Sequence, residues 1–389
     1  MRLSQQLFVL IALGITTSLS AQQASDRPPR ESVEIKGVLL LNAHYSDDLV
    51  NDREAPWLAA PRNQMSGERI EALGSTVRQS RVLVAVSATE ILGANFEGEL
   101  DLDFFGTQPG GSRRDPMPRV RRLVGRITWP NAWVLFGQEA LPISTIDPSS
   151  FSTVSVPGFT GSGNLSRWLP QVRIGMEMGT SLRIGIEGAA VAPRFNNMLD
   201  DEPSHPDEAE LSKRPFIQGR LLTRWGAGDN GGEISVGGHY GWYTSGTDTL
   251  GVTRAAAVSG QIFLTSMVEI RGEAFRGEAL GMLGGGGIDQ TLSPNGEPVR
   301  TEGGWAQLNV HLSPQLEVGG GYGVDNPHNA DVDRVSGRTY NMTWELHGHF
   351  RVSPLVIAVE YRRIETTYYD AVYDLQTANC LNAALGLVF

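Results

Sequence analysis

Residues 340–352 have the sequence "YNMTWELHGHFRV", in which apolar and polar side chains alternate with a period of two. One parity carries Tyr340, Met342, Trp344, Leu346, Phe350 and Val352, and the other carries Asn341, Thr343, Glu345, His347, His349 and Arg351. This alternation predicts a β-strand with one apolar and one polar face. Residues 92–105 and 170–178 alternate in the same way, as does the last stretch, "NAALGLVF" at 382–389.

Sixteen segments of this kind are expected along the chain. Their spans are 33–45, 76–89, 92–105, 119–129, 132–139, 170–178, 181–191, 215–226, 232–243, 254–264, 267–278, 303–312, 315–323, 339–352, 355–365 and 377–389. The connections between them alternate between short and long from the first strand to the last. This rhythm is typical of an up-and-down antiparallel barrel with tight turns at one rim and loops at the other. A Greek-key sandwich gives no reason for it.

The positions of the charged side chains decide which face of such a barrel meets water. In a soluble β-sandwich the charges would lie outside. Sixteen strands closed into one barrel leave a lumen too wide for side chains to fill, so polar inward residues stay wet. The apolar face then contacts lipid, and closing the sheet into a barrel leaves no unpaired strand edge in the membrane. We therefore predict an all-β, 16-stranded antiparallel transmembrane β-barrel over 33–389, with short periplasmic turns, long extracellular loops and Phe389 at the rim.

The amino terminus predicts export. Residues 1–21 combine Arg2, a short apolar run and small residues before Ala21, as a cleaved signal peptide does, and 22–32 form a polar, proline-bearing lead-in. No later stretch contains eighteen consecutive apolar residues. The net charge of −11 argues against nucleic acid as a partner, and the single Cys380 excludes an intrachain disulfide. The expected location is the cell outer membrane.

Three stretches carry a resemblance to a known family. They are "VRQSRVLVAV" (77–86), "PRVRRLVGRITWPNAWVLFGQ" (118–138) and "RWLPQVRIGME" (167–177). In this order, and with the strand layout and terminal Phe389, they resemble the Gram-negative outer-membrane porins, and among these the DcaP-like porins. The resemblance implies a trimeric diffusion channel for small hydrophilic, often anionic, solutes. That family often has a longer amino-terminal extension, so a function tied to the extension is not carried over.

The loop 140–169 is the candidate constriction. It is the third long loop, which general porins fold into the barrel, and it contains few charges apart from Asp147 and Arg167, with aromatic residues such as Phe151. A loop of this length without secondary structure is usually functional or disordered, and a disordered loop would be more charged and less aromatic. We expect it to fold inward, with a surface cover or a trimer latch as alternatives.

Fixed charges are expected to line the lumen. The candidates for solute selection are Arg81, Arg126, Arg173, Arg183, Arg220, Arg224, Glu97, Glu99 and Asp101. Charges in a narrow tube select ions, and arginine grips carboxylate or phosphate with two bonds. A basic wall facing an acidic patch on 92–105 would create a transverse field. The alternative is that these residues form salt bridges that stiffen the wall.

The predicted function is passive diffusion of small hydrophilic, preferentially anionic, solutes, which needs no cofactor. The expected partners are outer-membrane lipid and lipopolysaccharide, small polar solutes and two further copies in a homotrimer. A barrel hydrolase and a plugged structural or adhesive barrel are the rival classes. No "GxSxG" motif occurs, and "GGGG" at 284–287 precedes no "GK[ST]". His347 and His349 share a face with Glu345, but lumen-lining polar residues explain them equally, so no catalytic or metal residue is assigned.

Overall fold

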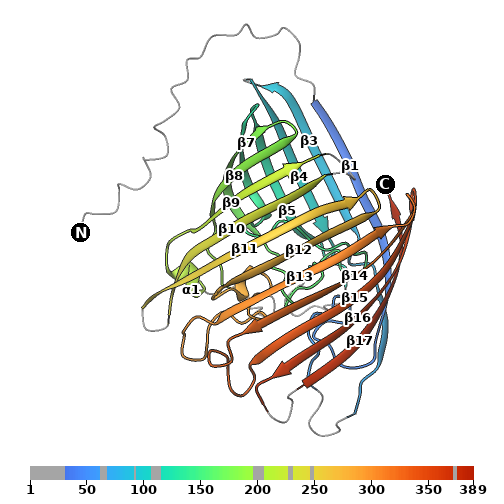
Figure 1. The fold of residues 1–389 in the computed structure, drawn as a ribbon, viewed down its shortest axis with the longest axis vertical. Helices are drawn as coiled ribbons and strands as arrows, with labels where there is room; N and C mark the ends of the chain where they lie inside the picture. Colours follow the sequence, from blue (N-terminus) through green and yellow to red (C-terminus); the bar gives the residue numbers. More distant parts are fainter. Residues whose placement is uncertain are drawn as a thin grey trace.

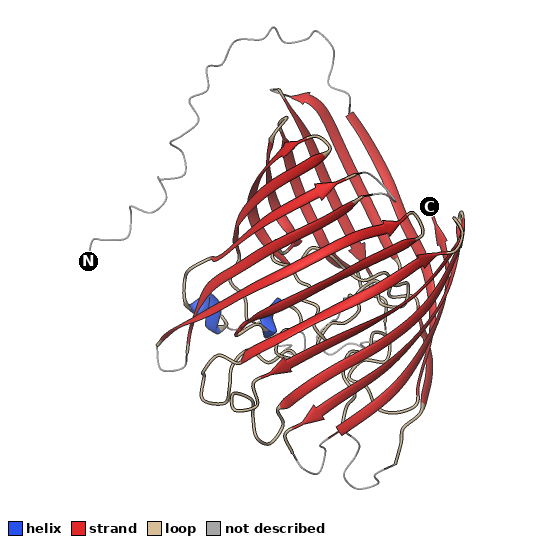
Figure 2. Ribbon diagram, in the orientation of Figure 1, coloured by secondary structure: helices blue, strands red, loops and turns tan. Residues whose placement is uncertain are grey.

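The computed structural model describes residues 31–61, 68–91, 93–106, 115–195, 206–226, 231–245, 249–370 and 375–389. The predicted signal peptide and nearly all of the predicted lead-in lie outside the described residues. Strands make up most of the described chain (Figure 2). The helical segments among the described residues are α1 (Glu208–Leu211) and the 3-10 turn η2 (Gly281–Leu283). No helix in the described ranges is long and apolar enough to span a membrane.

The strands form one closed antiparallel sheet (Figure 1). Apart from β2 and β3, which both pair with β1 and not with each other, each strand pairs with its neighbour in sequence, and β17 pairs with β1 to close the barrel. Their bounds are β1 Glu31–Ser46, β2 Ala72–Thr76, β3 Arg81–Ile91, β4 Ala94–Asp103, β5 Arg119–Thr128, β6 Ala132–Ala140, β7 Trp168–Gly179, β8 Leu182–Val191, β9 Phe216–Trp225, β10 Gly232–Thr244, β11 Leu250–Thr265, β12 Val268–Glu278, β13 Arg300–His311, β14 Leu316–Pro327, β15 Arg338–Val352, β16 Leu355–Tyr368 and β17 Leu375–Val388.

The predicted strand 76–89 is divided into β2 and β3, which share one position in the barrel. The second half of β1 pairs with β2 and the first half with β3, so the barrel has sixteen positions, as predicted. Residues 77–80 turn out of the sheet, with the Ser80 N–H donating to the Val77 carbonyl at 3.0 Å. The Leu40 N–H donates to Ser80 Oγ at 2.9 Å, so a side chain replaces the missing ladder bond. The break turns Gln79 into the interior, where it is fully buried.

The two faces of each strand differ as predicted. On β15, Trp344 and Leu346 are exposed on the outer face, whereas Glu345, His347 and His349 are buried inside. On β17, Leu385 and Leu387 face outward and Cys380 is buried inward. Apolar side chains therefore cover the outside of the barrel, and most charges of these strands point inward.

The strand ends sort into two rims. Short turns join β5 to β6, β7 to β8 and β15 to β16 at the rim where β1 begins and the chain ends (upper end of Figure 1). Long connections, such as 141–167 and 279–299, leave from the opposite rim. We call these rims the short-turn end and the long-loop end.

Part of the interior is apolar, which differs from a lumen lined by polar residues alone. Leu141, Leu165 and Leu283 pack with inward residues of β8 to β12 in a dry cluster. The full set of buried members is Leu141, Ile143, Leu165, Leu169, Ala189, Val191, Phe195, Ala209, Phe216, Tyr243, Ala257, Phe275, Ala279, Leu280, Met282 and Leu283. Burial of apolar area holds the loops 141–167 and 279–299 against one side of the wall. The open space is left on the other side.

Candidate functional site

The connection between β6 and β7 lies inside the barrel. Near its start the Ile143 N–H donates to Gln218 Oε1 on β9 at 3.2 Å. At its tip the Phe151 N–H donates to Glu360 Oε1 on β16 at 2.5 Å. Further on, Arg119 of β5 donates to the Ser155 carbonyl at 2.7 Å. Because β5, β9 and β16 lie at separate positions around the barrel, the loop crosses the interior rather than covering a rim.

A glycine in this loop permits a close approach to the wall. Gly163 has φ +99°, in the region that favours glycine, and a Cβ there would lie 2.3 Å from the Gly304 carbonyl oxygen of β13. Nearby, Leu165 N–H donates to Glu273 Oε1 at 2.9 Å. The returning half of the loop is thereby fixed against β12 and β13.

Between the first half of the loop and the wall formed by β3 to β9 lies a cavity of about 370 Å³, which we call the basic cavity. Seven guanidinium groups and four carboxylates border it. The bordering residues are Arg81, Asp101, Arg121, Arg122, Arg126, Trp133, Leu135, Glu139, Ala140, Thr145, Asp147, Trp168, Arg173, Glu187, Arg220 and Arg224. Its border therefore carries an excess of positive charge.

Most of these arginines are paired along the wall. Arg81 pairs with Asp101, and Arg122 pairs with Glu139 at 2.5 Å. Arg220 lies 2.9 Å from Glu187 and 3.0 Å from Glu233. Three acids of β4, Glu99, Asp101 and Asp103, contact arginines of the adjacent β3 and β5, so they lie within the basic wall rather than opposite it. The transverse field expected from the sequence is replaced by a ladder of alternating charges.

Arg126 differs from its neighbours. Its guanidinium stacks on the Trp133 ring, 4.2 Å from the ring centre, and it makes no ion pair within the part of the chain that the structure describes. Stacking on an aromatic face orients a guanidinium and leaves its edge able to contact an anion. Arg126 is thus the cavity cation whose charge is least compensated.

The predicted site residues are distributed over three places. Those bordering the basic cavity are Arg81, Arg126, Arg173, Arg220, Arg224, Asp101 and Asp147. Glu97 and Glu99 border a second cavity of about 320 Å³ toward the short-turn end, which shares Arg122, Arg126, Leu135 and Glu139 with the first. Arg183 borders neither cavity and pairs with Glu177 at 3.2 Å.

The three loop residues predicted for the constriction do not lie together. Asp147 faces the basic cavity, and its backbone carbonyl accepts from Arg271 at 3.0 Å. Phe151 lies at the tip, edge-on to the His349 ring at 5.1 Å between ring centres. Arg167, at the end of the loop, is outside the lining of the cavity and lies in the field of Asp289. Only Asp147 is placed to act on a solute in the basic cavity.

Sequence reasoning missed Arg121 because strict alternation places it outside. Asp101 pairs with Arg122 and Leu102 pairs with Val120, so Arg121 is an extra residue in a β-bulge. The bulge turns Arg121 inward, where it donates to the Val154 carbonyl at 2.7 Å and lies over the Trp168 ring. Three arginines within four residues, "RVRR" at 119–122, are the only feature of the sequence that would fit such a bulge.

The surroundings of the Asp147 carboxyl group shift its pKa. Enclosure within the barrel raises its pKa above the ordinary value of 3.8, and Arg121, Arg81 and Arg271 oppose that rise. Its side chain nevertheless stays accessible from the cavity. The charge of Asp147 is therefore sensitive to pH values above the usual range of an aspartate.

Beyond the basic cavity, one group among the described residues has the spacing of metal ligands. It consists of Glu317, His347 and His349, whose ligand atoms all lie within 4.8 Å of one another. The group lies on the opposite wall, under the tip of the loop 141–167.

The closed barrel with an inward loop has the fold of the porins. The outer membrane channel DcaP of Acinetobacter baumannii superposes with a TM-score of 0.71 and 15% identity, over 92% of this chain and 97% of that chain. The resemblance to DcaP-like porins indicated by the sequence is thus present in the fold. An anion-selective porin from Comamonas acidovorans gives a TM-score of 0.59 at 12% identity, over 92% of this chain and 100% of that chain. The trimer form of OmpT, an outer membrane protein of Vibrio cholerae, gives 0.54 at 14%, over 92% and 99%. No family model and no curated protein matches the sequence.

Proposed function

We propose that the protein is an outer-membrane porin through which small hydrophilic, preferentially anionic, solutes diffuse passively. The observation that carries this proposal is the basic cavity, enclosed between an arginine-bearing wall and a loop that crosses a closed barrel. A fixed excess of positive charge in a confined aqueous space favours the entry of anions. A second cavity toward the short-turn end shares four bordering residues with the first, and its border has four glutamates, Glu34, Glu97, Glu99 and Glu139, against Arg122 and Arg126.

The outer face supports a location in the outer membrane. Val172, Ile174 and Met176 of β7 are each more than half exposed, which is unfavourable in water and favourable in lipid. In that membrane the short turns would face the periplasm, the long loops would face outside, and the predicted signal peptide would direct export. A homotrimer is the assembly that the resemblance to porins suggests.

Planar-bilayer recording of the purified full chain tests the proposal. We expect stepwise conductance and a reversal potential, under a salt gradient, that shows anions to be more permeant than cations. A folded barrel is recognised independently by its heat-modifiable migration in gel electrophoresis. Silence from protein that passes this test would refute the porin function.

Such silence would favour the rival plugged barrel. The observation that supports the plugged barrel is the dry cluster, in which residues of three long connections fill one side of the interior. Conductance without anion preference would retain the channel and reject the role assigned to the arginines.

A further inference from the structure

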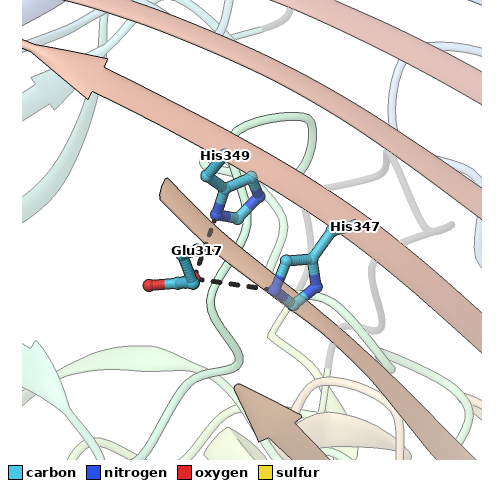
Figure 3. Close-up of side chains that lie close together, drawn as sticks. All are labelled: Glu317, His347 and His349. Carbon is cyan, nitrogen blue, oxygen red and sulfur yellow. Dashed lines mark hydrogen bonds and ion pairs between the residues drawn. The ribbon is translucent and has the colours of Figure 1, made fainter. Parts of the chain in front are cut away.

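Glu317, His347 and His349 are brought together by the register of β14 and β15 (Figure 3). Glu317 is directly opposite His349, and His347 is two residues earlier on the same inward face of β15. The two imidazole rings are stacked with centres 4.4 Å apart. Gly319, opposite His347, leaves room for the ring, since a Cβ there would lie 2.5 Å from Nε2.

The distances between the potential ligand atoms suit a small cation. His349 Nδ1 is 3.1 Å and His347 Nε2 is 3.5 Å from the same carboxylate oxygen, Glu317 Oε1. In a tetrahedral zinc site with bonds of about 2.0–2.1 Å, ligand atoms lie roughly 3.3 Å apart. The two observed distances bracket this value, and the two histidine nitrogens lie within 4.8 Å of each other, so the three atoms can converge on one ion by a movement of the rings.

The outer nitrogen of each histidine already faces a carboxylate. His349 Nε2 is 3.2 Å from Glu360 Oε1, and His347 Nδ1 is 3.4 Å from Glu345 Oε1. Histidines that bind metals almost always donate their second N–H to such a group, which fixes the tautomer and strengthens the ligand. Arg362 holds the outer carboxylates in turn, with Nη2 at 2.9 Å from Glu360 Oε2 and Nε at 3.7 Å from Glu345 Oε2.

The contacts of His347 with Glu317 and Glu345 are long, at 3.5 and 3.4 Å. Its side chain is fully buried, yet neither ring nitrogen makes a hydrogen bond within the described residues. A buried polar group without a hydrogen bond costs free energy, so a ligand that engages Nε2 would remove a penalty. The charge balance around His347 also favours a cation, because the three carboxylates of Glu317, Glu345 and Glu360 are opposed by two guanidiniums, Arg351 and Arg362.

We propose that Glu317, His347 and His349 bind one divalent transition-metal ion of the Zn²⁺ type, with Glu345 and Glu360 as positioning residues. Neutral imidazole and a carboxylate are ligands that such ions accept, whereas Mg²⁺ and Ca²⁺ prefer oxygen alone. This site is separate from the basic cavity and does not depend on conduction.

Binding there would reach the tip of the loop 141–167. Ser149 Oγ donates to Glu317 Oε1 at 2.9 Å, and Ser150 Oγ donates to Glu360 Oε2 at 2.7 Å. An ion that fixes Glu317 and, through His349, Glu360 would therefore also fix the tip. Without an ion, charged histidines would bridge the carboxylates instead, and the site would be an ordinary polar network.

The test uses the full chain, purified in detergent without a histidine tag and stripped with a chelator. Zn²⁺ is titrated against a chromophoric chelator, and Co²⁺ serves as a probe through its visible absorption. We expect one ion per chain and Co²⁺ bands displaced by Zn²⁺. X-ray absorption of the Zn²⁺-loaded wild type should show scattering from imidazole.

Three variants separate this site from surface binding. His347→Asn combined with His349→Asn should abolish binding, and Glu345→Gln should weaken it by about 10- to 100-fold. The matched control is His328→Asn, a substitution of a half-exposed histidine beyond the end of β14, which should leave binding unchanged. Binding that survives in the double variant overturns the proposal. Should that variant not fold, wild-type X-ray absorption without imidazole scattering overturns it equally.

Discussion

Arg126→Gln removes the cavity charge that has no carboxylate partner within the described residues. Seven guanidiniums and four carboxylates border the cavity, and Glu99, Glu177 and Glu233 pair with three of the arginines from behind the border, so the change removes a charge that no ion pair offsets. A unit charge about 5 Å away contributes about 0.8 kcal/mol in water, which corresponds to a factor of about 4 for an anion. For a cation the factor has the opposite sense. We therefore expect the anion-to-cation permeability ratio to fall by between about 4-fold and about 15-fold.

The assay is the reversal potential across a planar bilayer under a salt gradient centred near 0.1 M, where screening extends over about 10 Å. Arg126→Lys keeps the charge and should keep the selectivity. A matched control removes a compensated pair: Arg173→Gln with Glu187→Gln alters the same wall without changing its net charge, and should leave the ratio nearly unchanged. An unaltered reversal potential in Arg126→Gln, with normal conductance, would refute the steering role of the uncompensated arginine.

Three further predictions concern the loop and the pH dependence. Gly163→Ala places a Cβ against Gly304 and a non-glycine residue at φ +99°, at a cost of about 1–3 kcal/mol. Hydrogen-exchange protection of the loop should therefore fall roughly 5- to 150-fold. Unchanged protection would contradict the docking of the loop on β13. Gln79→Ala deprives the Ser152 carbonyl of its donor, so exchange should rise at 152–155 and stay unchanged in β7. Because the pKa of Asp147 is raised, acidification should neutralise it above the ordinary range, and anion selectivity should then increase as pH falls; Asp147→Asn should remove that increase, and a persistent increase would assign it to another group.

The barrel could be predicted from the sequence because the alternation of apolar and polar residues is repeated from strand to strand. Each segment such as 340–352 has to present one face to each environment, and the alternation of short and long connections follows from the up-and-down order. The break between β2 and β3 could not be predicted, because residues 77–80 continue a pattern compatible with a strand. Their turn is stabilised by contacts with β1 and with the interior loop, which are distant in sequence.

The site was predicted in part for similar reasons. Arg81, Arg173 and Arg220 follow the alternation of their strands, so their inward direction was predictable, whereas their ion pairs depend on register. Arg121 was missed because a bulge shifts the parity by one residue. The sequence placed Glu345 beside the two histidines, but Glu317, the carboxylate whose Oε1 lies within 3.5 Å of both, comes from the neighbouring strand. Pairing between strands is information that a single sequence does not contain.

The course of the loop 141–167 across the interior fixes an order of assembly. Phe151 and Glu360, which form a hydrogen bond at the tip, are 209 residues apart in the chain, and Gln79, which donates to the Ser152 carbonyl, comes from before β3. Of these contacts, the one with Glu360 needs β16 in place opposite the loop, which the pairing of β17 with β1 secures. Contacts between such distant segments form late because the entropy of closing the intervening chain has to be overcome first. An unclosed sheet could already hold the loop at β5, β9 and β12, so the tip at Phe151 is the part of the loop that is fixed last.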